Sequence, residues 1–186
     1  MTVEEKSGYK SWGNLKKQMN ELLSDSLKDK ISYCYTTYRR VHDTYGRATI
    51  NFEKRELAAF SWHMRYEQWD DEHKILNDSN SDICHLGSLP QVWEKQKQIQ
   101  KELSREKWMP ECILCDGDFI NAVTSYLKTD ISSSLNSDNY IMRVFAYMDR
   151  RLGKRTLLKI RDDAEVMPDW VKQFYHIRCQ AEGLEF

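Results

Sequence analysis

Several features that would mark a particular class of protein are missing from these 186 residues. No apolar run approaches the ~20 residues that a transmembrane helix needs. Acidic and basic residues nearly balance, at 29 Asp and Glu against 28 Lys and Arg, so no overall charge draws the chain to nucleic acid or to an anionic membrane. Only 7 Gly and 3 Pro are present, which favours long regular elements. We therefore expect a globular protein with no membrane partner.

The short motifs of the common enzyme classes are also absent. The sequence contains no P-loop, no GxSxG turn, no HExxH motif and no glycine-rich dinucleotide turn. Asp43, Glu53 and Arg55 faintly resemble the acidic and basic core of a metal-dependent nuclease, but arginine replaces the usual lysine and few strands surround it. We expect a non-enzymatic protein without a cofactor, and keep a metal-dependent hydrolase as the second alternative.

The cysteine count is low and odd, at five. Residues 1–10 are polar and acidic without the apolar core of a secretory signal, so we expect reduced thiols and a cytoplasmic location. Cys112 and Cys115 have zinc-ligand spacing, and Cys84 with His85 would complete four ligands. Adjacent residues rarely bind one zinc ion together, however, and no strand precedes the CxxC pair as in redox proteins. Ordinary semi-buried thiols are the favoured interpretation.

The pattern of apolar residues predicts an α+β fold that is mostly helical. One apolar face predicts a helix over residues 12–27. Strands are predicted from Ile31, over 48–52 and over 56–60, with a turn at Gly46, whose glycine can take a positive φ. This antiparallel sheet of two or three strands is too small to stand alone, so it must pack against a helical carboxy-terminal core.

We predict a single domain over residues 1–186, in three stretches. Residues 1–76 form the first helix, the meander and a helix from Ser61; residues 77–115 form a variable loop and a polar helix over 91–107; residues 116–186 form the helical core.

The helical core is predicted around one central helix, Ser137 to Arg155. Ser137 suits its N-cap and Gly153 a left-handed C-terminal cap. A helix capped by Asp116 or Asp118 and a short turn over 131–135 precede it. One or two helical turns over 154–160 and a last helix over 169–182, opened by Pro168 and closed by Gly183, follow it.

A charged residue interrupts the apolar stripe of the last helix. Arg178 lies within that stripe, and an unpaired buried charge is costly. Asp149 on the central helix and Glu182, one turn after Arg178, are the natural partners. The sequence thus predicts an ion-pair constellation that staples the two helices together. The alternative is an anion pocket formed by Arg178, Arg151 and Lys154.

A second charge pattern is a basic block from Arg150 to Arg161, with no acid inside it. Such a block can grip phosphate backbones, and its candidate binding residues are Arg150, Arg151, Lys154 and Arg155. The alternative is a solvated helix face neutralised by the acids that follow. No aromatic ladder accompanies the block, which weakens a role in single-strand binding.

Two carboxy-terminal stretches carry a likeness to known sequences, Asp149-Arg-Arg-Leu-Gly-Lys-Arg155 and Phe174-Tyr-His-Ile-Arg-Cys179 with Ala181-Glu-Gly183, as do Ser11-Trp12 and Gly46-Arg-Ala-Thr-Ile50. Through them the chain resembles a family of uncharacterised bacterial proteins of similar length, except over residues 77–115. The resemblance implies no particular activity. It groups Asp149, Arg151, Arg155, Arg178 and Glu182 as one constellation.

The leading functional expectation is a cytoplasmic interaction or accessory protein whose partner is another protein. Aromatic residues expected to be exposed, Tyr45, Trp93 and Trp108, and the polar helix favour it. The first alternative is an anion- or nucleic-acid-binding module that uses the Arg150 to Arg161 face. The oligomeric state is left open.

Overall fold

The computed structural model describes residues 11–36, 46–61 and 108–184. Predictions for the helices over 62–76 and 91–107, the loop between them, Tyr45 and Trp93 lie outside this part of the chain. The described elements are α1 (Trp12–Leu22), β1 (Ile31–Thr36), β2 (Arg47–Phe52), β3 (Arg55–Ser61), α4 (Asp116–Tyr126), α5 (Ile131–Leu135), α6 (Tyr140–Met148), α7 (Lys154–Lys159), α8 (Arg161–Glu165) and α9 (Asp169–Ala181). The predicted fold class, mostly helical with a small antiparallel sheet, is confirmed.

The sheet is a three-stranded antiparallel meander in the order β1-β2-β3. Ile50 in the central strand pairs with Tyr33 on one side and Ala58 on the other, and all three are buried. Glu53 and Lys54 have φ angles of 47° and 69° and form the two-residue turn between β2 and β3. One face of the sheet therefore faces the core, because alternate residues along a strand point the same way.

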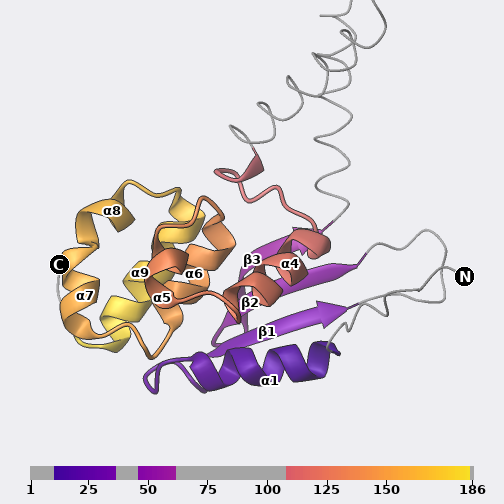
Figure 1. Cartoon of the computed structure of the whole chain (residues 1–186), viewed down its shortest axis with the longest axis horizontal. Coiled ribbons are helices and arrows are strands. Elements are labelled where there is room, and N and C mark those ends of the chain that lie inside the picture. Colours follow the sequence, from indigo (N-terminus) through magenta and orange to yellow (C-terminus); the bar gives the residue numbers. More distant parts are fainter. Residues whose placement is uncertain (1–10, 37–45, 62–107, 185–186) are drawn as a thin grey trace, which may run out of the picture.

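Aromatic rings join the helices to this face. The Phe119 ring of α4 stacks on Phe60 of β3 at a centroid distance of 5.2 Å. Trp12 of α1 and Phe145 of α6 lie 5.9 and 5.8 Å from the same Phe119 ring. Figure 1 shows α1 and α4 beside the sheet and α5 to α9 gathered next to it. Phe119 is thus the point at which sheet and helices meet.

The last helix, α9, has the predicted ends. Pro168 is its N-cap, and Gly183 takes a φ of +70° after the final turn. The Leu184 amide donates to the Cys179 carbonyl at 2.9 Å, which satisfies a carbonyl that the helix end leaves open. The Tyr175 hydroxyl donates to the Leu157 carbonyl at 2.8 Å and ties α9 to α7.

Two helices are shorter than predicted, and for the same reason. The first ends at Leu22 rather than at residue 27, and the central helix covers Tyr140–Met148 rather than 137–155. Leu23 and Asp149, the residues that follow them, are both extended and pair as an antiparallel bridge. This pairing between distant segments overrides the helical pattern, which continues through both positions. Asn139, not Ser137, is the N-cap of α6.

Two glycines have other roles than predicted. Gly153 has a φ of −82° and precedes α7, so it is not a left-handed cap. Gly46 is not among the described glycines with positive φ. A Cβ built on Gly46 would lie 2.0 Å from Asp116 Oδ2, so Gly46 is needed for close approach to α4. No helix in the described residues is long and apolar enough to span a membrane.

Candidate functional site

A short clasp connects the end of α1 to the end of α6. The Ser24 amide donates to the Met148 carbonyl at 2.9 Å, and the Arg150 amide donates to the Leu22 carbonyl at 2.8 Å. These two hydrogen bonds flank the Leu23 and Asp149 bridge. The clasp turns the chain away from α6 just where the predicted charged residues begin, and it sends Asp149 and Arg150 into different surroundings.

The Asp149 carboxylate is directed into the core and is fully paired. Its residue is only 1% exposed. The Tyr126 hydroxyl donates to its Oδ2 at 2.6 Å, and Arg151 donates through Nη2 at 2.7 Å and through its own main-chain amide at 2.7 Å. Burial, followed by the hydrogen bond to Asp149, raises the pKa of Tyr126. The carboxylate therefore joins α4 to the segment after α6.

Arg178 reaches the same clasp from α9. It is 3% exposed. Its Nη1 donates to the Met148 and Asp149 carbonyls at 3.2 and 3.3 Å, and its Nη2 donates to the Leu152 carbonyl at 3.0 Å. These carbonyls lie at and beyond the end of α6, where a helix leaves acceptors unpaired. Burial lowers the pKa of the guanidinium, and the charge of Glu182 opposes that shift.

Glu182 supplies the countercharge. Its Oε1 lies 3.2 Å from Arg178 Nη2 and accepts the Ser26 hydroxyl at 2.9 Å. Lys154 donates to the Glu182 main-chain carbonyl at 2.7 Å. We call Tyr126, Asp149, Arg151, Arg178 and Glu182 the buried network. Arg178 is thus paired with the Glu182 carboxylate, and it meets Asp149 only through the main chain.

The four predicted binding residues do not share one surface role. Arg151 is held by Asp149 and Lys154 by Glu182. Arg155 is exposed on α7. Arg150 instead faces the open side of α1, where it meets basic residues from the start of the chain.

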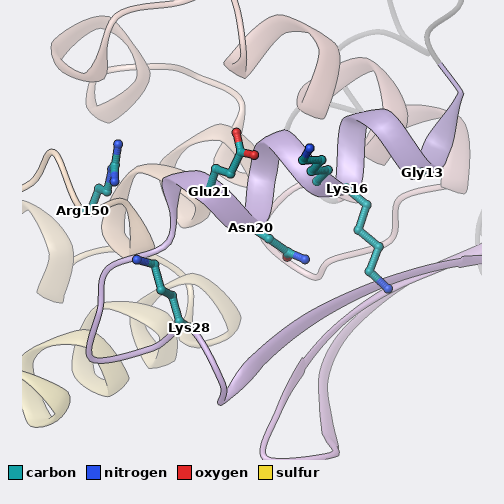
Figure 2. A pocket seen from close by; sticks show the side chains of 7 residues that line it. Gly13, Lys16, Asn20, Glu21, Lys28 and Arg150 are labelled. Carbon is teal, nitrogen blue, oxygen red and sulfur yellow. The ribbon is translucent and has the colours of Figure 1, made fainter.

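That surface is a basic hollow of about 680 Å³. Its lining comes from α1, from the turns after α1 and from the clasp, and consists of Gly13, Lys16, Lys17, Asn20, Glu21, Lys28 and Arg150. Figure 2 shows Arg150 at one end of the row and Gly13 at the other, with Glu21, Asn20 and Lys16 between them. A Cβ added at Gly13 would meet no atom within 4 Å, so this end is open.

The positive charges of the hollow are largely uncompensated. Four of its side chains are basic and one, Glu21, is acidic. Across the described residues, Lys16, Lys17 and Arg150 make no ion pair. Lys28 pairs with the exposed Asp25, and its hydrogen bond lowers the pKa of that carboxyl. Basic side chains that gather with so few acidic partners favour an anionic ligand.

The sequence predicted no site residue on α1. The spacing of Gly13, Lys16, Lys17, Asn20 and Glu21, at steps of three and four, does place them on one side of α1, opposite the buried Leu15 and Met19. That signal was available. Lys28 and Arg150 lie near the end of α1 because of the clasp, and no local sequence pattern reveals that contact.

The cysteines show no metal site within the described residues. No group of three or more His, Cys, Asp and Glu side chains there could hold an ion, and Cys84 and His85 lie outside that part of the chain. Cys115, rather than the predicted Asp116 or Asp118, is the N-cap of α4. The Cys112 thiol contacts the Ala59 carbonyl at 3.9 Å, and burial raises its pKa to about 12.

The hydrolase set is also incomplete in the described residues. Glu53 and Arg55 are both exposed at the β2–β3 turn, and Asp43 lies outside the described ranges. Trp108, expected to be exposed, is buried at 6% exposure. The prediction was wrong because polar neighbours in the sequence, from which the exposure of Trp108 was inferred, do not determine whether a fold buries a side chain.

Neither curated proteins nor solved structures gave a match. A family model, by contrast, covers residues 11–179, a span that includes α1, the sheet, the clasp and α9 as far as Cys179. The chain belongs to the SF0329 protein family.

Proposed function

We propose that this protein is a binding protein that recognises an anionic partner through the basic hollow. One observation carries the proposal: basic side chains from three segments line one hollow, and three of them have no ion-pair partner among the described residues. Unpaired surface charges repel one another, so an arrangement that brings them together costs stability unless a ligand neutralises them.

The hollow replaces the Arg150 to Arg161 block as the anion-binding surface. Arg151 and Lys154 of that block are engaged with acids of the protein itself. Arg150 alone joins Lys16, Lys17 and Lys28. The partner we propose is still another protein. The charge of the hollow now supports this, rather than exposed aromatic residues, because Trp108 is buried.

We place this binding in the cytoplasm. Cys34, Cys112, Cys115 and Cys179 are free thiols, and Cys34 is exposed. A reducing compartment keeps such thiols from forming disulfides.

The proposal is tested by fluorescence anisotropy with a labelled polyglutamate peptide over a salt series. The wild-type protein binds at low salt and loses affinity as salt rises, because screening weakens contacts between exposed charges. The double variant Lys17→Glu/Arg150→Glu binds about tenfold more weakly, which corresponds to the loss of roughly 1.4 kcal/mol.

The matched control is Arg155→Glu/Lys159→Glu, which makes the same change in net charge on α7. Both of these residues are exposed and lie outside the lining. The control retains wild-type affinity if the hollow is the site. Equal losses in the two double variants, or no binding by the wild type at low salt, would contradict the proposal.

A further inference from the structure

The lining of the basic hollow carries a charge pattern rather than a uniform charge. Along the outward side of α1, the cations Lys16 and Lys17 come first and the acid Glu21 follows. Beyond the end of the helix, Arg150 and Lys28 restore positive charge. Figure 2 shows Glu21 in the interior of this row, with Arg150 on one side of it and Lys16 on the other. The order is therefore positive, negative, positive.

The spacing of these charges can be set against that of possible ligands. Lys17 and Glu21 are four residues apart on α1, a rise of about 6 Å along the helix axis. In an extended peptide, side chains two residues apart lie on one side and are separated by about 6.6 Å. An acidic, a basic and an acidic residue at alternate positions of such a peptide would meet the three parts of the row in turn.

A nucleic acid fits the same row less well. Its backbone carries only negative charge, so a phosphate would face Glu21 in the middle of the hollow at an energetic cost. The lining residues include no aromatic side chain on which a base could stack. Asn20, beside Glu21, carries an amide that can both donate to and accept from a peptide main chain.

We propose that the partner is a protein segment in which acidic residues flank a basic residue, with the acids at Lys16, Lys17 and Arg150 and the base at Glu21. This inference rests on the proposed function, because it needs the hollow to be the binding site. Glu21 acts in it as the residue that selects among anionic partners: it repels an unbroken run of negative charge and attracts the central base.

The test uses two labelled synthetic peptides of equal length and one short DNA duplex. The mixed peptide has Glu, Lys and Glu at alternate positions, and the acidic peptide has Glu at all three. The wild-type protein binds the mixed peptide about threefold more tightly than the acidic peptide, a ratio typical of one exposed charge pair, and more tightly than the duplex. Glu21→Lys reverses the order of the two peptides.

Glu111→Lys is the matched control, since Glu111 is exposed before α4 and outside the hollow. This variant keeps the wild-type order of peptides. If the acidic peptide or the duplex binds the wild type more tightly than the mixed peptide, or if Glu21→Lys leaves the order unchanged, the inference is wrong. The proposed function survives that result provided Lys17→Glu/Arg150→Glu still weakens binding about tenfold, so the two failures are distinguishable.

Discussion

Asp149 and Arg150 are neighbours in the chain, yet their side chains lie in opposite environments. The Asp149 residue is 1% exposed, and its carboxylate accepts hydrogen bonds from Tyr126 and from Arg151. Arg150 is exposed and faces the basic hollow without an ion-pair partner in the described residues. The clasp separates the two, because its extended backbone points consecutive side chains to opposite sides.

The charged residues of the candidate site therefore fall into two groups, those of the buried network and those of the basic hollow. In the network every charged group meets an opposite charge, and Arg178 also meets three main-chain carbonyls, as burial requires. In the hollow, four basic side chains surround one acid. Charges of the first kind stabilise the structure, and charges of the second kind are available to a partner.

Arg178→Met should have the largest effect. The change keeps the apolar stem but removes the charge, so that Glu182 loses its nearest cation and three carbonyls lose a donor. Breaking a buried pair in this way costs about 3–5 kcal/mol. Urea denaturation measures this loss as a decrease in the free energy of unfolding. Arg155→Met, at an exposed position on α7, is the control and should change stability little. A stable Arg178→Met protein would break the distinction between the two regions.

Tyr126→Phe should have an intermediate effect. It removes the 2.6 Å hydrogen bond to Asp149 and leaves the ring contact with Phe145 in place. A hydrogen bond to a buried charged group contributes about 1.5–3 kcal/mol. The free energy of unfolding should fall by that amount, while the affinity for the mixed peptide stays at the wild-type value. A loss of affinity in this folded variant would show that network and hollow are not independent.

Asp25→Asn should have the smallest effect, and it acts on the hollow. The carboxylate of Asp25 pairs with Lys28 at the edge of the lining, and both side chains are exposed. Removing that competitor frees Lys28 for an anionic ligand, so affinity for the mixed peptide should rise about twofold with little change in stability. The same titration in Asp29→Asn is the reference. Weaker binding by Asp25→Asn would exclude Lys28 from the site.

Local sequence signals predicted the elements better than their ends. Alternation identified β2, and Pro168 and Gly183 located α9, because these signals depend on neighbouring residues alone. The ends of α1 and α6 were missed, since they are fixed by pairing between Leu23 and Asp149. Tertiary contacts of this kind override helical periodicity.

The candidate site divides in the same way. Arg178 was singled out because a charge in an apolar stripe is visible in the sequence, and the i+4 spacing suggested Glu182. Its contacts with main-chain carbonyls were not visible, because they exist only where α6 stops early. The hollow was missed as a unit, since Lys17 and Arg150 are more than one hundred residues apart and meet only in the fold.

The most direct test of this division is an NMR titration of the isotope-labelled protein with the mixed peptide. We predict that the largest amide shifts fall on residues 13–21, Lys28 and Arg150, while the amides of Asp149 and Arg178 in the buried network change little. Shifts concentrated on α7, or spread through the buried network, would contradict the assignment of binding to the hollow and of stability to the network.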